Sequence, residues 1–256
     1  MRKIVFSFDD GRKDTFENAY PILKKYSLPA TINISTSFVE NPDKFKGQFV
    51  SSKSKSMSID NVIEMYKNGF EIASHGDNHK NDKKDICESL KKLSYWGINV
   101  EKIGFASPNS YYNNDNYAEI KPLIESKTIK YVRSGRQLKR DGLLYGIISY
   151  LSEVTHSKFL FYISNKRNII KKGKNYKILP SITINSNITN KQICFLLNKI
   201  ESDDSLILMY HAILDEDNLP LNNKWYNKIQ DFDELCYWIH KNERFSVVRT
   251  IDLIDD

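Results

Sequence analysis

Short apolar runs with β-strand character alternate with amphipathic helical stretches along most of this chain. The run 4–8 precedes a helical pattern over 14–26, and the same order recurs, with further strands expected at 30–34, 70–73, 102–105, 129–132, 206–209 and 245–248. Further helices are expected at 59–67, 82–96, 116–126, 189–200 and 231–240. Such alternation is typical of mainly parallel strands joined by helical crossovers, in an open sheet or in a closed barrel. The sequence therefore predicts an α/β protein and, because it shows no internal repeat or linker, one domain over residues 1–256.

Two stretches do not follow this alternation. Residues 37–57 are rich in Ser and Lys, and we expect them to form a long surface loop, such as a lid or a substrate rim. Residues 143–184 contain several β-rich pieces with weak helical periodicity, so the pattern assigns them neither to helices nor to strands.

The composition narrows the class of protein. Hydrophobic residues make up 40% of the chain, which permits a sizeable core, and the net charge of +6 comes from lysines spread along the whole sequence, as on a solvated basic surface. The three cysteines are isolated, which argues against a disulfide framework or a cysteine-based zinc site. No run reaches the ~18 apolar residues of a membrane span. Because Met1 leads almost directly into a strand, without room for a signal peptide, a cytoplasmic location is expected if Met1 is the native start.

Two adjacent carboxylates, Asp9 and Asp10, follow the first predicted strand. On a regular strand they would point to opposite faces, but Gly11 indicates a turn that would let both face one cleft. A metal would then separate their roles, with one carboxylate as ligand and the other as a free base. A plain turn or helix cap explains the same three residues, so the pair alone leaves both interpretations open.

A pair of histidines follows another predicted strand. His75 and His79 are four residues apart, so on a helical turn both rings would lie on one face and converge on one ion. A zinc ion with two histidines and one carboxylate keeps a position for water, whose pKa falls to roughly 7. Asp77 lies between them, either supporting the site or facing solvent. His211 ends the apolar run 206–210, where it could act as a general acid or simply pack at the strand end.

Together these residues resemble the polysaccharide deacetylase family, the NodB-homology or carbohydrate esterase family 4 hydrolases. The family's first motif, Thr or Ser followed by Phe-Asp-Asp-Gly, matches Ser7–Gly11. Its second motif, His-Ser/Thr-x-x-His, matches residues 75–79 with Gly76 in place of the hydroxyl residue. Its last motif, a leucine and a histidine that end a strand, matches residues 208–211. The order and spread of the motifs agree, so the resemblance covers essentially the whole chain.

The resemblance implies a distorted (β/α) barrel of mainly parallel strands, with the site at the carboxyl ends of those strands. It implies metal-dependent hydrolysis of N-acetyl groups on an amino sugar of a glycan or glycan precursor, with metal-bound water as the nucleophile. By this resemblance Asp9 is the general base, His211 is the general acid, and Asp10, His75 and His79 are the metal ligands. The expected cofactor is a divalent metal, Zn²⁺ first, with Co²⁺, Ni²⁺ or Fe²⁺ as alternatives.

The third motif departs from the family pattern. The family has Arg-x-Pro-Tyr/Phe, whereas residues 105–110 read Phe-Ala-Ser-Pro-Asn-Ser, so Ala106 stands where an arginine usually orients the catalytic aspartate. The backbone N–H of Asn109 could still donate a hydrogen bond to the oxyanion, since that role needs no particular side chain. Arg133 or Arg136, after another predicted strand, could replace the missing charge, and a surface position explains either arginine equally well.

The fourth motif, Asp-x-x-Asp-Trp, has no match, so no partner for His211 is predicted. Ala106 and this missing motif keep one alternative open, a catalytically silent carbohydrate-binding protein on the same barrel. Nucleic-acid binding through the lysine-dense stretch 166–177 is a weaker alternative, because a solvated loop explains those lysines as well, and no nucleic-acid partner is expected. The sequence leaves open which glycan is the substrate, whether it is free, lipid-linked or nucleotide-linked, and the oligomeric state.

Overall fold

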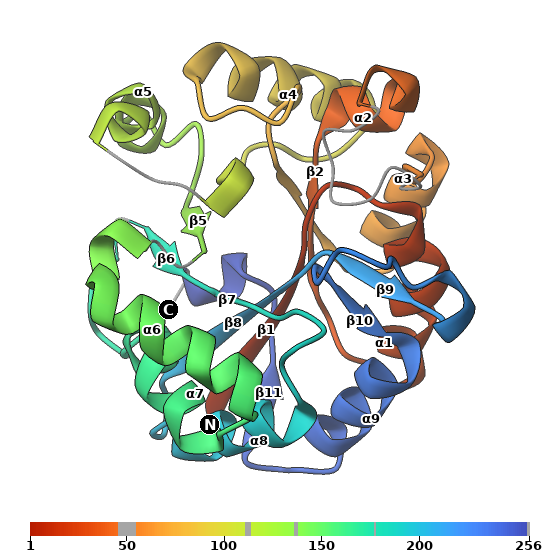
Figure 1. The fold of residues 1–256 in the computed structure, drawn as a ribbon. Coiled ribbons are helices and arrows are strands. Elements are labelled where there is room, and N and C mark those ends of the chain that lie inside the picture. Colours follow the sequence, from red (N-terminus) through yellow and green to blue (C-terminus); the bar gives the residue numbers. More distant parts are fainter. Residues whose placement is uncertain (46–54, 111–113, 136–137, 177, 255–256) are drawn as a thin grey trace.

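The computed structural model describes residues 1–45, 55–110, 114–135, 138–176 and 178–254 (Figure 1). Helices lie around the outside of a curved parallel sheet, and the two-stranded sheet of β9 and β10 lies beside α1 and α9. Among the described residues, no helix combines the length and the apolar character that crossing a membrane requires.

The sheet forms a nearly closed barrel, and every pairing in it is parallel. Its order is β6-β5-β4-β3-β2-β1-β8-β7, and β11 pairs with the first half of β1. The expected α/β barrel of mainly parallel strands is therefore confirmed. The strands are β1 (Arg2–Phe8), β2 (Thr31–Ile34), β3 (Glu71–Ser74), β4 (Phe105–Ala106), β5 (Val132–Ser134), β6 (Leu179–Pro180), β7 (Ile182–Thr183), β8 (Ser205–Tyr210), β9 (Ala212–Leu214), β10 (Tyr226–Lys228) and β11 (Phe245–Val247).

One short segment of chain bridges the two edges of the sheet. β6 pairs with β5 and β7 pairs with β8, and only Ser181 separates β6 from β7. The Ser181 N–H donates to the Ser134 carbonyl (2.9 Å), which continues the pairing with β5. The barrel is therefore closed by a single five-residue run, residues 179–183, which we call the seam.

Several helices agree closely with the sequence pattern. α3 begins after Ser58, whose hydroxyl accepts the Asn61 N–H while the Asn61 side chain accepts the Ser58 N–H, a capping box. Thr189 and Gln192 form the same arrangement at α8. The helices are α1 (Tyr20–Lys25, after a π-helical turn Thr15–Ala19), α2 (Thr36–Glu40), α3 (Ile59–Lys67), α4 (Lys83–Tyr95), α5 (Asn114–Glu125), α6 (Leu138–Thr155), α7 (Lys158–Asn165), α8 (Asn190–Lys199) and α9 (Ile229–His240).

Two local expectations were wrong, the loop 37–57 and the starts of two strands, and the structure assigns the stretch that the sequence pattern left open. The predicted loop 37–57 contains most of α2 and a 3-10 turn, Pro42–Phe45, and residues 46–54 lie outside the described residues. The unassigned stretch 143–184 is mainly helical, as α6 and α7. β4 and β5 begin three residues later than predicted: Ile103 and Ile129 are buried, but they lie just outside the regular ladder.

A buried carboxyl group joins elements near the amino-terminal ends of the strands. Glu71 at the start of β3 accepts hydrogen bonds from the hydroxyls of Thr31 and Tyr131, both at 2.7 Å, and from the Ile251 N–H at 3.0 Å. Burial raises the pKa of Glu71 above its usual range, although these hydrogen bonds oppose the effect. Gly104 leaves the space that the Tyr131 ring fills, since a Cβ at Gly104 would lie 1.9 Å from that ring.

Candidate metal and catalytic site

The turn after β1 brings both aspartates to one end of the barrel. Asp10 has φ 80° and Gly11 has φ 85°, two consecutive left-handed residues. Asp9 Oδ2 and Asp10 Oδ1 lie 4.0 Å and 3.5 Å from His75 Nε2, so the two carboxylates approach the same ring. Both are almost completely buried. Left-handed backbone at Asp10 itself, and not only at Gly11, therefore breaks the strand alternation.

The two histidines converge through a loop, and the expected helical turn was wrong. No helix covers residues 75–81; Gly76 (φ 78°) and His79 (φ 58°) reverse the backbone direction instead. The rings lie edge to face with centroids 4.8 Å apart, and His79 Nε2 is 3.6 Å from Asp10 Oδ1. Asp85 in α4 fixes this loop by accepting the N–H groups of Asn78 (2.9 Å) and Lys80 (3.1 Å).

Asp77 supports the histidine loop from behind. Its buried carboxylate accepts hydrogen bonds from Thr36 (2.7 Å) and Ser37 (2.6 Å) at the start of α2 and pairs with Lys92 of α4 (2.8 Å). Burial raises the pKa of Asp77, but Lys92 and the two hydroxyls outweigh it and hold the pKa below its usual value. Of the two roles left open for Asp77, the structure therefore assigns the supporting one.

Three side chains fit a divalent metal. The ligand atoms of Asp10, His75 and His79 lie within 4.8 Å of one another, and Asp10 Oδ2 is buried with no hydrogen-bond partner among the described residues. His75 Nδ1 lies 2.8 Å from the Ala106 carbonyl oxygen, so Nδ1 carries the proton and Nε2 presents its lone pair toward Asp10. Burial and the neighbouring His75 lower the pKa of His79 to about 4, which keeps its ring neutral. Two neutral imidazoles and one carboxylate suit zinc and related divalent ions.

Arg133 and Asn33 hold Asp9. Arg133 Nη2 lies 2.5 Å from Asp9 Oδ1, and Asn33 Nδ2 donates to the same oxygen at 2.8 Å. Arg133 is fully buried and stands beside Ala106 in the register of β5 and β4. Burial raises the pKa of Asp9, but Arg133, His75 and His211 outweigh it, so the pKa lies below its usual value. Arg136, the alternative arginine, lies outside the described residues.

The sequence pattern did not identify Asn33. The signal that could have identified it is its amide side chain inside the buried strand Thr31–Ile34. A buried polar side chain within a strand usually forms a hydrogen bond with another polar group.

His211 follows β8 next to an aromatic side chain. Its ring centroid lies 5.8 Å from that of Trp225, and its Nδ1 is buried with no hydrogen-bond partner among the described residues. Burial lowers the pKa of His211, while the charges of Asp10 and Asp9 oppose the change. The sequence predicted no neighbour for His211. Trp225, the one aromatic ring described beside it, could have been suspected because it stands in a polar loop.

Asn109 lies in the loop that follows β4. It has φ 58°, is exposed, and belongs to the 3-10 turn Pro108–Ser110. The side chain of Asn81 ties this turn to the histidine loop, because it accepts the Ser107 hydroxyl (2.7 Å) and donates to the Pro108 carbonyl (3.1 Å). The loop that carries Asn109 is therefore anchored to the loop that carries His79.

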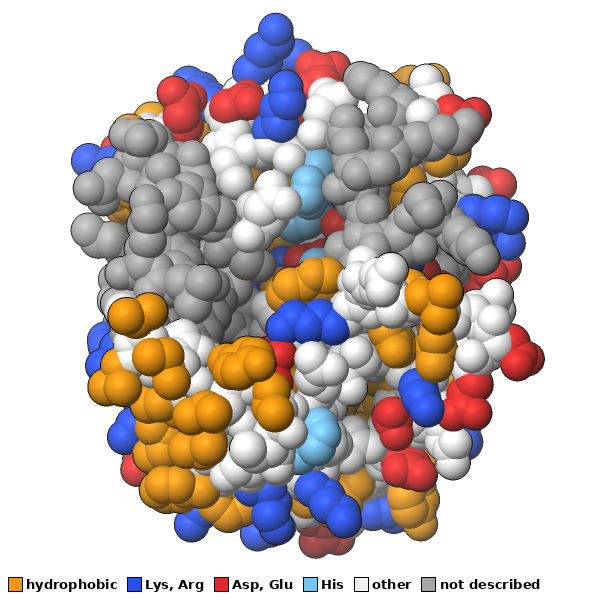
Figure 2. Space-filling view, viewed as in Figure 1, with side chains coloured by type: hydrophobic (Ala, Val, Ile, Leu, Met, Phe, Trp, Pro, Cys, Tyr) orange, Lys and Arg blue, Asp and Glu red, His pale blue; other side chains and the backbone are white. Residues whose placement is uncertain are grey.

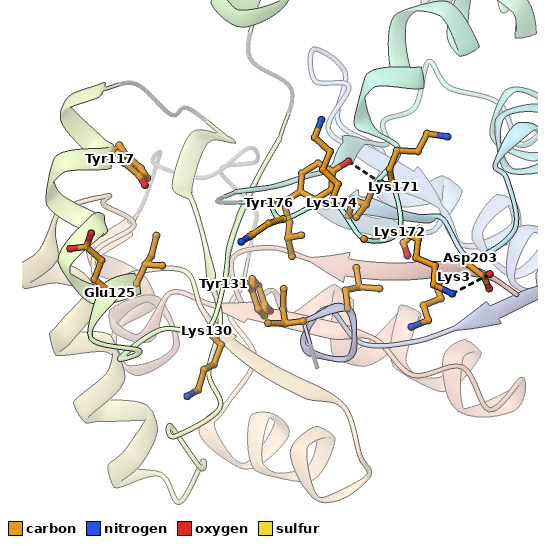
Figure 3. Close-up of a pocket in the computed structure, with 18 of the residues that line it drawn as sticks. Lys3, Tyr117, Glu125, Lys130, Tyr131, Lys171, Lys172, Lys174, Tyr176 and Asp203 are labelled. Atoms are coloured by element: carbon orange, nitrogen blue, oxygen red, sulfur yellow. Dashed lines mark hydrogen bonds and ion pairs between the residues drawn. The ribbon is translucent and has the colours of Figure 1, made fainter. Parts of the chain in front are cut away.

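A separate cavity of about 890 Å³ is lined by Lys3 at the start of β1, by Ser205 at the start of β8, and by none of the candidate site residues (Figure 3). Three lysines of the stretch 166–177 reach it, but each has a partner nearby. Lys171 pairs with Asp204 (2.6 Å), Lys172 pairs with Asp203 (3.4 Å), and Lys174 lies over the Tyr176 ring. These pairings reduce the positive charge available to a polyanion, which weakens the nucleic-acid hypothesis.

The sequence of this chain is similar to known polysaccharide deacetylases. Residues 1–121 match the family model described as polysaccharide deacetylase. A poly-beta-1,6-N-acetyl-D-glucosamine N-deacetylase of Staphylococcus aureus (strain MRSA252) is 30% identical over 169 residues, which cover 63% of this chain and 53% of the relative. The chain thus spans about half the length of the curated relatives it matches.

Solved structures share the fold. A peptidoglycan N-acetylglucosamine deacetylase superposes with a TM-score of 0.56 at 11% identity, covering 99% of this chain and 88% of the other. A family 4 acetyl xylan esterase from Clostridium thermocellum, solved with a cobalt ion, superposes with a TM-score of 0.54 at 13% identity, covering 99% and 90%. At such identities the likeness concerns the fold alone.

Proposed function

We propose that this chain is a polysaccharide deacetylase, as the match of residues 1–121 to that family model supports, and that it hydrolyses N-acetyl groups on the amino sugars of a glycan. The observation that carries the proposal is the pairing of a three-residue ligand set, Asp10, His75 and His79, with a separate carboxylate, Asp9, held by a buried arginine. The name of the Staphylococcus aureus relative favours a polymer of N-acetylglucosamine as the substrate class.

In this proposal Asp10, His75 and His79 hold the divalent metal, with Zn²⁺ first and Co²⁺, Ni²⁺ or Fe²⁺ as alternatives. When bound, the cation supplies Lewis-acid activation of water and of the acetyl carbonyl. The protein's own contribution is to turn the His75 ring toward Asp10 through the Ala106 carbonyl, and to keep the His79 ring neutral through burial, which lowers its pKa.

Asp9 acts as the general base. Arg133 and Asn33 both occupy its Oδ1, so the carboxylate stays ionised and its Oδ2 lies on the side of His75. From there Asp9 accepts the proton of the attacking water as the new C–O bond forms. The Asn109 N–H, on the loop after β4, donates to the oxyanion that develops on the carbonyl oxygen.

His211 acts as the general acid. It donates a proton to the sugar nitrogen as the C–N bond breaks, which releases acetate and leaves a free amine. Its burial favours release of the proton, and the nearby carboxylates of Asp9 and Asp10 favour its uptake. The Trp225 ring lies near the His211 ring, with 5.8 Å between their centroids.

The test is acetate release from N-acetylated β-1,6-glucosamine oligosaccharides by protein loaded with Zn²⁺ or Co²⁺. We expect turnover that a chelator abolishes, and a loss in kcat of about a hundredfold or more in Asp9→Asn, the usual range for a general base. Asp217→Asn, an exposed aspartate in another loop, is the matched control and should retain full activity.

The competing function is a carbohydrate-binding protein without turnover, which Ala106 and the unmatched fourth motif first suggested. Calorimetry would then show oligosaccharide binding whose affinity a chelator does not change. If no N-acetylated glycan tested also released acetate, these results would establish binding alone and refute the hydrolase.

A further inference from the structure

Helix α6 exposes its apolar side chains. Beyond Gly142, where the backbone is not helical (φ 75°), the helix is rich in large apolar residues, and most of them face solvent. Leu143 is 84% exposed, Tyr150 67% and Val154 59%. The full set, here called the α6 face, is Leu143, Leu144, Ile147, Tyr150, Leu151 and Val154, and exposed Phe159 of α7 follows them in the chain.

The inward side of the same helix is polar. Ser152 is buried, and its carbonyl accepts the Gln192 side chain (2.9 Å). Glu153 pairs with Lys224 (2.6 Å) and accepts a longer hydrogen bond from Asn185 (3.5 Å). A helix on a soluble protein normally packs its apolar stripe inward. In α6 beyond Gly142, Tyr145 and Ile148 are half-buried but the other large apolar side chains face solvent, and such an exposed apolar surface is typical of a site where something else binds.

The α6 face opens on the same side of the molecule as the candidate site. Figure 2 shows apolar side chains gathered over α6 on the face whose hollow reveals histidine side chains. A cavity of about 320 Å³ lies between α6 and Trp225, the neighbour of His211, because Tyr150 and Glu153 of α6 line it together with Trp225. A partner that covers the α6 face would therefore lie beside this cavity, on the same side of the molecule as the candidate site.

The surroundings of the α6 face are basic. Residues 143–168, which contain α6 beyond Gly142, α7 and the turn after α7, include one acidic residue, Glu153, and three basic residues, Lys158, Lys166 and Arg167. Arg167 lies over the ring of Tyr145 in α6, 4.0 Å from its centroid, which places a guanidinium against this helix. Apolar and aromatic side chains combined with lysine and arginine are the composition of helices that lie in the interface of an anionic membrane.

We propose that the α6 face binds a negatively charged lipid surface, with the helix lying parallel to it. Leu143, Tyr150 and Val154 are each more than half exposed, which suits insertion between lipid headgroups. A second copy of the chain is the less suitable occupant, because a two-fold pairing of this face would bring the same basic residues together from both chains. Because the α6 face and the candidate site lie on the same side of the molecule, the proposal rests on the proposed function and extends it to glycans carried on a lipid or made at a membrane.

The test is cosedimentation of the full chain with vesicles, without metal and without sugar, so its result is independent of deacetylation. We expect binding to phosphatidylcholine vesicles that contain phosphatidylglycerol, and weaker binding to phosphatidylcholine alone or at high salt. The triple variant Leu143→Gln, Ile147→Gln and Val154→Gln should bind at least about tenfold more weakly, since three apolar side chains leave the interface.

The matched control replaces two exposed apolar residues elsewhere, Tyr95→Gln and Leu221→Gln, and should bind as the unmodified chain does. Because all five positions are exposed, circular dichroism should report unchanged thermal unfolding for both variants. The proposal is overturned if the unmodified chain ignores anionic vesicles or if the triple variant binds equally well. It is also overturned if analytical ultracentrifugation shows a dimer that the triple variant dissociates while no vesicle binding occurs.

Discussion

One buried guanidinium holds Asp9, and it comes from β5 rather than from β4. Ala106 and Arg133 are lateral neighbours in the β4–β5 register, so Arg133 reaches Asp9 from the strand next to the position where the family motif has its arginine. The sequence narrowed the replacement to Arg133 or Arg136 but could not choose between them. The choice depends on strand register, because a shift of one residue turns a side chain to the other face of the sheet.

Arg133→Met tests this ion pair. The Asp9 carboxylate would remain buried without its cation, so we expect the free energy of unfolding at neutral pH to fall by about 3 kcal/mol, as for other broken buried pairs. Urea denaturation measures the loss. Moving the arginine back to β4, in Ala106→Arg with Arg133→Ala, should recover part of the stability, and no recovery would show that the β4 position cannot reach Asp9.

Gly76 is the residue on which the histidine loop depends. A Cβ there would lie 2.5 Å from Asp85 Oδ2, and φ is 78°. Gly97 also has a positive φ, 86°, but nothing lies within 4 Å of its missing Cβ. Gly97→Ala should therefore cost only the backbone strain, about 1–2 kcal/mol, and Gly76→Ala should cost more because the Asp85 contact is added. Equal losses in chemical denaturation would mean that the clash relaxes freely.

Among the helices, the sequence predicted those that begin with a capping hydroxyl, but it did not predict α6, whose large apolar side chains mostly face solvent. Ser58 and Thr189 mark the starts of α3 and α8 in the sequence, because a hydroxyl followed three residues later by an amide is a local signal. α6 gave no such signal, because most of its large apolar residues face solvent. The helical pattern expects an apolar stripe that faces the core, so the sequence suggests irregular β-rich pieces here. The loop 75–81 was misjudged for a related reason, since spacing alone does not distinguish a helical turn from two left-handed residues.

Glu71 of β3 accepts a hydrogen bond from Ile251, in the 3-10 turn Ile251–Leu253, and its raised pKa predicts a pH effect on stability. The pKa of Glu71 is raised in the folded protein, so the folded state holds the proton more tightly than the unfolded state. The stability that this proton contributes is complete below the unfolded pKa and is lost as pH rises through the folded pKa. Relative to Glu71→Gln, the unmodified chain should lose stability as pH rises above about 4.5. A difference that is constant with pH, measured by urea denaturation, would contradict the raised pKa.

For the whole molecule, the alternation of strands and helices predicted a parallel α/β arrangement, but closure into a barrel rested on the family resemblance. The seam explains why: β6 and β7 have two residues each, too few to carry a periodic signal. The candidate ligands and His211 could be named from the sequence because each follows a strand, and parallel strands bring their carboxyl ends to one rim. Their supports, Asn33 and Trp225, come from positions that no motif marks.

A metal held between loops from different strands should stabilise the entire fold. We expect Zn²⁺ to raise the midpoint of thermal unfolding, by an amount that corresponds to about 2.7 kcal/mol at a hundredfold excess over Kd. Asp10→Asn should abolish the increase, whereas Asp217→Asn should preserve it. An increase of equal size in Asp10→Asn would place the ion elsewhere.

The seam also couples the barrel wall to the proposed reaction. The hydroxyl of Ser181, the residue between β6 and β7, lies 3.4 Å from the same guanidinium that holds Asp9. A fluctuation that parts the wall at this point also withdraws support from Arg133, and the carboxylate it leaves behind becomes more basic. Opening of the barrel at the seam should therefore raise the pKa of Asp9. We expect variants that speed amide hydrogen exchange at residues 179–183 to show a higher Asp9 pKa as well.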